Sequence, residues 1–359
     1  MTARLRATLL AAALFVAFVV ALFVQPTGYS LLSPGPTVDI LGMDGSTPIV
    51  TIKGHKSYPD DGELRMLTVL ELPPDAPLSI VSAVQHWLND DTSVYPLSFL
   101  YPPGTTSSSN AQEGVAEMAS AQDLAKAAAL RQAGYKVTEL DQVLVQGIEP
   151  KGPSQGRVHV GDVLVSVAGK PVSTPQQAIT DVRRYRPGDV ISFVVQRAGK
   201  LIPLSVKSIA AGTTGVAATT PRIGLSLGSS QQFKFPFTIN ISIPDSIMGP
   251  SAGMMFALTI YDKLTPGSLT KGHNIAGTGT IDAAGNVGAI GGIAQKIKAA
   301  QRDGAQLFLA PASNCDEVRR ASYDHSAMRV VRIKTLSDAI RAVTAWTANQ
   351  NAVLPGCSR

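Results

Sequence analysis

The stretch DSIMGPSAGMMFALTIY, residues 245–261, joins two segments of different character. Residues 235–243, which precede it, alternate and are rich in β-branched side chains, as in a strand, whereas residues 254–261 form an apolar run with helical composition. Ser251 is therefore expected at a strand-to-helix turn shaped by the neighbouring glycines and proline. The first backbone N–H groups of a helix lack acceptors within it, so a serine there is either an ordinary N-cap or a reactive hydroxyl beside an anion site.

A second segment supplies a candidate base for this hydroxyl. The pair Gly291-Gly292 precedes residues 293–300, which have helical composition. At about 100° per residue, Lys296 lies at the edge of an apolar stripe, while Lys298 points away from it. Burial lowers the pKa of a lysine because it disfavours the charged form, and a neutral amine can accept a serine proton. The alternative is a lysine that reaches solvent from the edge of the helix.

These segments together resemble the proteolytic domain of Lon proteases. Gly-Pro-Ser-Ala-Gly around Ser251 is followed by TGTI at residues 278–281, by VGAIGG at residues 287–292, and then by the helix with Lys296. Their order and spacing are those of the family. The resemblance implies an α+β proteolytic domain over residues 221–350.

The same resemblance implies roles for three side chains. Ser251 is the expected nucleophile, Lys296 its base, and Thr278 a hydroxyl that helps to orient the lysine. In the family a charged residue and a glycine usually precede the Pro-Ser pair. Here Ile247 and Met248 precede Gly249, and the nearest charged residue before them is Asp245. Lon proteases normally carry an ATPase module, but the sequence contains no Gly-x-x-x-x-Gly-Lys-Ser/Thr phosphate loop, so neither a nucleotide nor another cofactor is expected.

Residues 135–207 change to short β-branched strands around a single helix, residues 174–185, with Thr174 as its cap. Gly161-Asp162 at the entry to a strand, a tight glycine turn and a Gln-Ala-Ile helix resemble a PDZ domain. Such a domain leaves a strand edge open beside a helix, and an unfolded or C-terminal peptide segment of a substrate can add there as an extra strand. The alternative is a small β spacer without a ligand.

The remaining segments complete an α+β multidomain chain. An Ala-rich helix over residues 111–133, capped by Asn110, is grouped with the PDZ-like region as residues 111–209. Residues 26–110 hold short β-like runs and are expected to form a β-rich stalk, to which no function is assigned. A Thr-, Ala- and Gly-rich linker at residues 210–220 precedes the proteolytic domain.

Residues 1–25 are expected to be a short cytoplasmic N-terminus and a single membrane span. Residues 7–24 contain no charged side chain, and about 20 apolar residues are typical of a spanning helix. Arg4 and Arg6 precede the span and the next lysine is Lys53, so the positive-inside rule places the bulk of the chain outside the cell membrane. A secretory signal peptide is the alternative, although the end of the apolar run lacks a small-x-small cleavage site.

Composition limits the other partners. The net charge is +5, but lysine and arginine are scattered, so no nucleic-acid surface is expected. Cys315 and Cys357 have no other ligand residues at metal-binding spacing, so no metal site is expected. In an oxidising compartment these two cysteines are candidates for one disulfide, and two separate thiols are the alternative.

A PDZ domain before a Lon-like domain, behind one membrane span, resembles a class of ATP-independent bacterial serine endopeptidases. Lon-like domains commonly assemble into rings, so a homo-oligomer is also considered. Two other functions remain open. One is a catalytically inactive membrane scaffold that binds partners through its PDZ domain. The other is a Gly-x-Ser-x-Gly esterase, in which Asp303 with His325, or Asp262 with His273, would complete a triad with Ser251.

Overall fold

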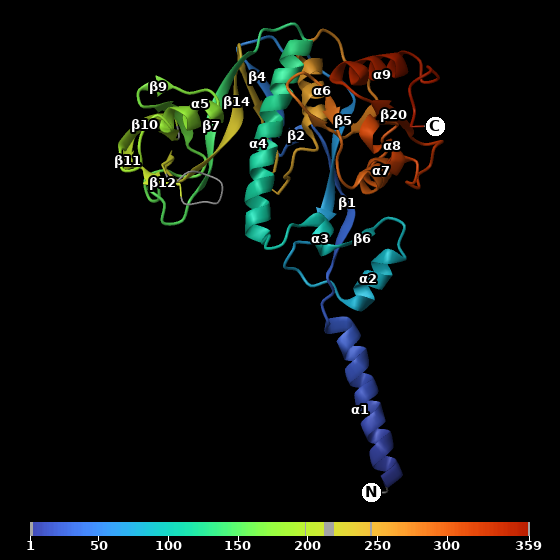
Figure 1. The fold of residues 1–359 in the computed structure, drawn as a ribbon. Helices are drawn as coiled ribbons and strands as arrows, with labels where there is room; N and C mark the ends of the chain where they lie inside the picture. The colour runs from blue at the N-terminus through green and yellow to red at the C-terminus, as the bar shows by residue number, and fades with distance from the viewer. Residues whose placement is uncertain (1–2, 198, 212–218, 245, 358–359) are drawn as a thin grey trace. The chain divides into compact units, whose positions relative to one another are not determined.

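The structure is a computed structural model that describes residues 3–197, 199–211, 219–244 and 246–357. The chain divides into two compact units, shown in Figure 1. The large unit comprises Met1–Lys136 and Pro236–Arg359, and the small unit is Val137–Phe235. The small unit is therefore an insertion into the sequence of the large one.

The large unit is built on a six-stranded sheet with the order β20-β19-β16-β5-β1-β6. The strands are β1 (Tyr29–Asp39), β5 (Glu63–Glu71), β6 (Ser93–Pro96), β16 (Asn274–Gly277), β19 (Leu307–Pro311) and β20 (Arg329–Ile333). The neighbours from β20 to β5 are parallel, whereas β1 pairs antiparallel with both β5 and β6. Segments from both ends of the chain thus meet at β16.

Two helices cover opposite faces of this sheet. A Cβ added to Gly277 of β16 would lie 2.6 Å from the sulfur of Met255, so that face is against α6 (Gly253–Leu264). The preceding residue, Ala276, packs in a buried cluster with residues of α7 (Ile293–Arg302) such as Ile297. Successive side chains of a strand point to opposite faces, so the sheet separates the two helices.

Further elements surround this three-layered core. Helices α4 (Ser107–Gln132) and α9 (Leu336–Ala348) pack against α6. The short helices are α2 (Ile80–Trp87), α3 (Leu97–Leu100), a 3-10 turn (Ala312–Asn314) and α8 (Cys315–Val318). Three antiparallel pairs join β2 (Met43–Asp44) to β3 (Thr47–Pro48), β4 (Val50–Lys53) to β15 (Thr238–Ile241), and β17 (Thr280–Ile281) to β18 (Val287–Gly288).

The small unit contains an antiparallel sheet with the order β11-β10-β8-β7-β14 and one helix, α5 (Pro175–Val182). The strands of this sheet are β7 (Thr138–Ile148), β8 (Val163–Val167), β10 (Val190–Arg197), β11 (Lys200–Lys207) and β14 (Leu225–Lys234). The short strand β9 (Lys170–Pro171) pairs with β8, and β12 (Ile209–Ala210) and β13 (Pro221–Arg222) form a separate pair. The predicted cap of α5 is confirmed, because the Thr174 hydroxyl accepts the Gln177 N–H in a capping box.

The N-terminal helix α1 (Ala3–Val24) is the one helix of the described chain that is long and apolar enough to cross a membrane. None of its apolar window is covered by other parts of the protein. A signal sequence passes the same test of length and composition.

Three boundaries differ from those expected. Residues 26–110 do not form a separate stalk, because β1, β5 and β6 belong to the large sheet. Helix α4 was grouped with the PDZ-like region but packs against α6. Conversely β14, expected in the proteolytic domain, pairs along its length with β7 of the small unit. Most of the linker expected at residues 210–220 lies outside the described residues.

The cap of α4 also differs from the prediction. The helix begins three residues before Asn110, and Thr106 is its N-cap, in a capping box with Ser109. Asn110 therefore lies in the first turn of the helix.

Candidate active site

Ser251 lies at the start of α6, as the sequence predicts. Ala252 is the N-cap residue of the helix, and Ser251 is partly exposed in the turn before it. The turn is held by Gly279, whose N–H donates to the Ser251 carbonyl at 2.9 Å and whose carbonyl accepts the Met254 N–H at 3.0 Å. A side chain at Gly279 would clash, since its Cβ would lie 2.6 Å from Val287. This positioning role of Gly279 was not predicted from the sequence.

Lys296 approaches the same turn from α7. Its Nζ donates to the Ser251 Oγ at 2.7 Å and to the Thr278 Oγ1 at 3.1 Å. Thr278 follows directly after β16 and in turn donates to the Ser251 carbonyl at 3.0 Å. The end of a central strand therefore joins the two helices that the sheet otherwise separates. The structure thus brings together all three residues expected at the site.

The Lys296 amine is enclosed by protein. The residue is only 2% exposed, and Thr278 is fully buried. Burial lowers the pKa of Lys296 from 10.5 to about 7, because removing the amine from water disfavours its charged form. Within the described residues no carboxylate forms an ion pair with it, so no nearby negative charge counteracts the effect of burial. Near pH 7 a substantial fraction of this amine is neutral and can accept a proton.

The histidine-based alternative finds no support in the geometry. The His273 ring contacts Gln306 and Trp346, while His325 packs against the ring of Tyr323. Asp262 accepts the Leu269 N–H, and Asp303 forms an ion pair with Arg302. None of the recorded contacts of these four residues reaches Ser251.

The two cysteines are paired with each other, which is one of the two alternatives expected. A disulfide joins Cys315, at the start of α8, to Cys357 in the C-terminal tail. Both belong to the buried cluster beneath α7. In the described part of the chain no three histidine, cysteine or acidic side chains gather as they would around a metal ion.

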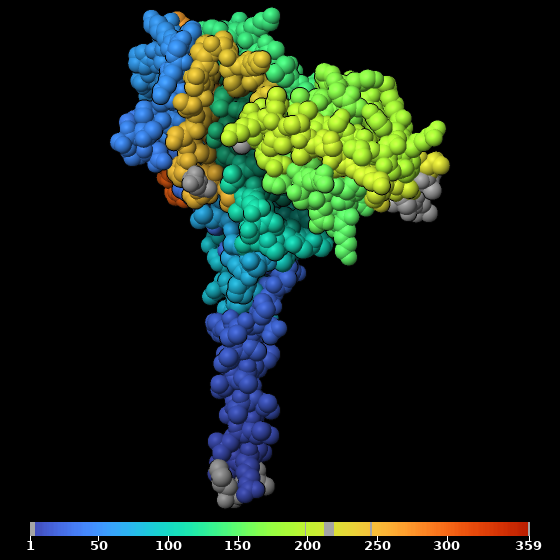
Figure 2. Space-filling view, turned by 90° about the vertical axis from the view of Figure 1, so that its left-hand side faces the viewer, coloured from blue at the N-terminus to red at the C-terminus, as the bar shows by residue number. Residues whose placement is uncertain are grey.

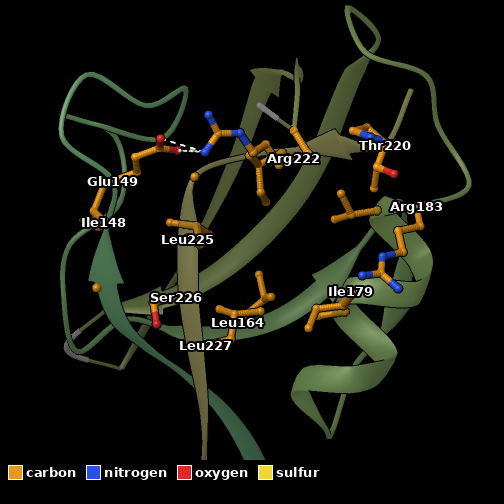
Figure 3. Close-up of a pocket in the computed structure, with 17 residues that line it drawn as sticks. Ile148, Glu149, Leu164, Ile179, Arg183, Thr220, Arg222, Leu225, Ser226 and Leu227 are labelled. Atoms are coloured by element: carbon orange, nitrogen blue, oxygen red, sulfur yellow. Dashed lines mark hydrogen bonds and ion pairs between the residues drawn. The ribbon is translucent and has the colours of Figure 1, made fainter. Parts of the chain in front are cut away.

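The small unit has a second candidate site, a pocket of about 610 Å³ between α5 and the beginning of β14 (Figure 3). Its floor and walls are mostly apolar, with Leu164, Ile179, Leu225 and Leu227 among the lining residues. Arg222 lies on one side and forms an ion pair with Glu149 at 2.7 Å. This groove was not predicted from the sequence, because β14 lies far from α5 in the chain.

Comparison with known proteins agrees with both units. Residues 192–345 match the Lon protease (S16) C-terminal proteolytic domain, and residues 119–208 match the PDZ domain. The Lon protease of Neorickettsia sennetsu is 28% identical over 150 residues, which is 41% of this chain and 17% of that protein. The Lon protease of Mesomycoplasma hyopneumoniae is 36% identical over 109 residues, which is 28% of this chain and 12% of that protein. The chain thus spans less than a fifth of the length of the curated relatives it matches.

Among solved structures, the PDZ domain of the SdrC-like protein from Listeria monocytogenes is 24% identical and covers 24% of this chain and 85% of that chain, with a TM-score of 0.22.

The family matches indicate the class: residues 192–345 match the proteolytic domain of Lon proteases, a peptidase domain of the serine type in that family. More particularly, the chain combines this Lon-type proteolytic domain with a PDZ domain and an apolar N-terminal helix.

Proposed function

We propose that the chain is a membrane-anchored, ATP-independent serine endopeptidase that uses a Ser251–Lys296 dyad. The observation that carries the proposal is the buried Lys296 amine, which lies 2.7 Å from the Ser251 hydroxyl and whose pKa is lowered to about 7. A serine hydroxyl needs a base to become a nucleophile near neutral pH, and a neutral lysine can serve.

In the proposed reaction, neutral Lys296 takes the proton of Ser251 as its Oγ attacks a peptide carbonyl carbon. The C–N bond then breaks, and Lys296 gives the proton to the leaving amine, which leaves an acyl-enzyme on Ser251. Water, activated by the same amine, attacks the ester and releases the second product. Thr278 acts as a positioning residue, because its hydroxyl contacts both the amine and the Ser251 carbonyl.

The start of α6 supports the stabilisation of the oxyanion. The recorded hydrogen bonds at this turn use the N–H groups of Gly253 and Met254. For Ser251 and Ala252, the described residues provide no backbone acceptor. Two free N–H groups beside the attacking oxygen, at the positive end of a helix, would stabilise the developing negative charge.

The small unit would capture substrate. The apolar groove between α5 and β14 suits an apolar side chain of an extended, unfolded or C-terminal peptide segment. Because the sequence has no phosphate loop to drive unfolding, we expect natively folded proteins to resist cleavage. Helix α1, which carries Arg4 and Arg6 in its first turn, would anchor the enzyme with its bulk outside the membrane.

The test is cleavage of a permanently unfolded protein by the full chain in detergent, without ATP. Ser251→Ala and Lys296→Ala should each lower the rate by about 10³-fold or more, since the two groups act as a unit. Ser246→Ala and Lys334→Ala change exposed residues of the same types and should cleave at the unmodified rate.

Three outcomes would count against the proposal. Activity that survives Lys296→Ala would identify a different base. Cleavage that requires ATP would remove the claim of independence. An unmodified chain that folds but cleaves nothing would favour the scaffold.

A further inference from the structure

A group of large apolar side chains is exposed in the large unit, on α2 and on the segment around α3. Helix α2 contains no buried residue at all. The exposed side chains are Ile80 (38% exposed), Val84 (49%), Trp87 (74%), Leu88 (72%) and Phe99 (73%). Soluble proteins seldom expose so many large apolar side chains to water, so we expect another molecule to cover this surface.

The attachment of both segments places them at the end of α1. The Thr27 N–H and hydroxyl both donate to the Leu78 carbonyl at 2.8 Å, and Pro26 forms a bridge with Ser79, the N-cap of α2. The Leu97 N–H, at the start of α3, donates to the Gly28 carbonyl at 2.8 Å. All these contacts involve the residues directly after the apolar helix.

These contacts fix the distance of the exposed group from the apolar helix. Bridged backbones lie about 5 Å apart, and the eight-residue α2 is about 12 Å long. The exposed group therefore begins within a few residues of the point where α1 ends. Figure 1 shows the same proximity, with α2 next to the upper end of α1 and α3 above it, and Figure 2 shows the light-blue and cyan part of the chain directly above this helix.

The chemistry of the surface favours the boundary layer of a lipid bilayer. Ile80, Val84 and Trp87 follow the spacing of one helical face. Tyr95 and Phe99 stack with ring centroids 5.4 Å apart. Aromatic side chains concentrate at membrane interfaces, where a ring meets acyl chains and its polar edge meets water.

The charges near this surface exclude one way of binding. Between residues 66 and 125 the sequence has no lysine or arginine. Asp91, close to the end of α2, is paired with Lys298 of α7 at 3.0 Å. Insertion of apolar groups, rather than attraction to anionic lipids, must therefore provide the binding energy.

We propose that α2 and the Tyr95–Phe99 pair lie in the interfacial layer of the bilayer that α1 spans, on the side to which the chain emerges. This inference rests on the membrane anchoring in the proposed function. It has a consequence for the dyad, because Gln295 of α7 donates to Ser93 at 2.7 Å. The helix that carries Lys296 is thus tied to a membrane-seated element, which would hold the active site at a fixed height above the lipid.

The experiment uses the fluorescence of Trp87 in the full chain, reconstituted in phosphatidylcholine vesicles. The chain has two tryptophans, and Trp346 is 4% exposed, so Trp346→Phe leaves Trp87 as the single reporter. Lipids that carry a spin label at the headgroup or high on the acyl chain should quench Trp87 several-fold more than a label near the acyl end does. Neither added salt nor anionic lipid should change this quenching.

The matched control is Trp87→Phe, in which buried Trp346 should show little quenching by any lipid. If Trp346→Phe folds poorly, the difference between the unmodified chain and Trp87→Phe gives the same quantity. Trp87 emission typical of water and insensitive to the labelled lipids would overturn the inference. A blue shift that rises with protein density but without lipid quenching would also overturn it, because it would indicate a second copy of the chain.

Flotation of the vesicles separates this inference from the anchor itself. A chain that floats with the vesicles while Trp87 stays in water would disprove the interfacial position of α2 but agree with the membrane anchor. A chain that does not float disproves both. Cleavage of an unfolded protein, measured on the same samples, reports the dyad independently.

Discussion

An ionisable side chain is buried at each end of α6, and in both cases its pKa is about 7. The two side chains differ in the groups that surround them. At the N-terminal end the Lys296 amine meets two hydroxyls, one of them on the partly exposed Ser251. At the C-terminal end Asp262 is 1% exposed, and burial together with the neighbouring Asp60 raises its pKa to about 7. One buried oxygen of Asp262 has no hydrogen-bond partner among the described residues, so nothing there compensates the burial of its charge.

The difference shows what burial alone achieves. Both environments bring the pKa of a buried group to about 7. At the N-terminal end the group with the shifted pKa lies against a partly exposed hydroxyl, that of Ser251. The C-terminal end instead joins two segments, since Asp60 lies in the loop before β5 and is paired with Lys263 at 2.8 Å. A buried group with a shifted pKa can therefore take part in a reaction only if it contacts a reactive side chain that substrate can reach. The following predictions test that distinction.

The largest expected effect is the pH dependence of cleavage. Lys296 must be neutral to accept a proton, so kcat/KM should rise with pH to a plateau above 7 and fall about tenfold per unit below it. The measurement is kcat/KM for an unfolded substrate from pH 5.5 to 9, with circular dichroism to check that the enzyme stays folded. Asp262→Asn should leave the midpoint unchanged. A midpoint that moves with this variant would mean that the two ends are coupled.

A smaller effect is expected at Thr278. Thr278→Val keeps the shape but removes the hydroxyl that contacts the amine, so kcat should fall about tenfold with little change in KM. Thr278→Ser retains the hydroxyl and should recover most of the rate. Equal rates for the two variants would contradict a positioning role, and a fall only in thermal stability would indicate a structural one.

The sequence was sufficient to predict the residues of the candidate active site but not the sheet that positions them. Ser251, Thr278 and Lys296 stand in short segments with distinctive glycines, so family order and helical geometry identified them. The sheet depends on parallel pairing of β5 with β16, whose partners are about 210 residues apart, as in Leu64 and Ile275. Local alternation cannot show such pairing, so residues 26–110 read as an independent stalk.

The boundary between the two units could not be predicted either, because it also depends on pairing between distant segments. β14 has the composition of either unit, and only its ten-residue register with β7 assigns it to the small one. The family matches overlap over residues 192–208, where the structure has β10 and β11 of the small unit. The groove beside α5 forms only because β14, which comes later in the chain, lines one side of it. The prediction of α5 and its cap was therefore confirmed, whereas the groove could not be predicted without the pairing of β14.

The third prediction concerns the stability cost of the dyad. The folded-state pKa of Lys296 is about 7 and its ordinary value is 10.5, so between these values the unfolded chain binds more protons. Stability therefore rises with pH across this window, and the cost of burying the amine is largest below pH 7. Lys296→Met fills the same space without a charge and should raise the free energy of unfolding by about 1–3 kcal/mol at pH 6.

This gain should shrink towards pH 10 while cleavage stays abolished at every pH. Urea unfolding, followed by the buried Trp346 of the large unit, would measure it. Lys334→Met, at an exposed position, serves as the matched control and should show no pH-dependent gain. A loss of stability in Lys296→Met at pH 6 would show that the hydroxyl contacts outweigh the burial cost.

The smallest expected effect lies at the other end of α6. Asp262 has an ordinary pKa of 3.8 and a folded-state pKa of about 7, so between these values the folded chain binds more protons and stability falls as pH rises. Asp262→Asn is neutral throughout, can still accept the Leu269 N–H, and can donate to Asp60. It should therefore raise the free energy of unfolding by about 1 kcal/mol above pH 7 and by almost nothing near pH 4.

Asp44→Asn, an exposed change of the same kind, should leave the pH dependence of unfolding unaltered. A gain for Asp262→Asn that is equal at pH 4 and pH 8 would mean that the pKa of Asp262 is not raised in the folded chain. If the pH-dependent gain appears and cleavage is unchanged, then the same burial that activates Lys296 serves at Asp262 only to join the loop before β5 to α6. The comparison would then isolate the accessible serine as the feature that separates a reactive buried group from a structural one.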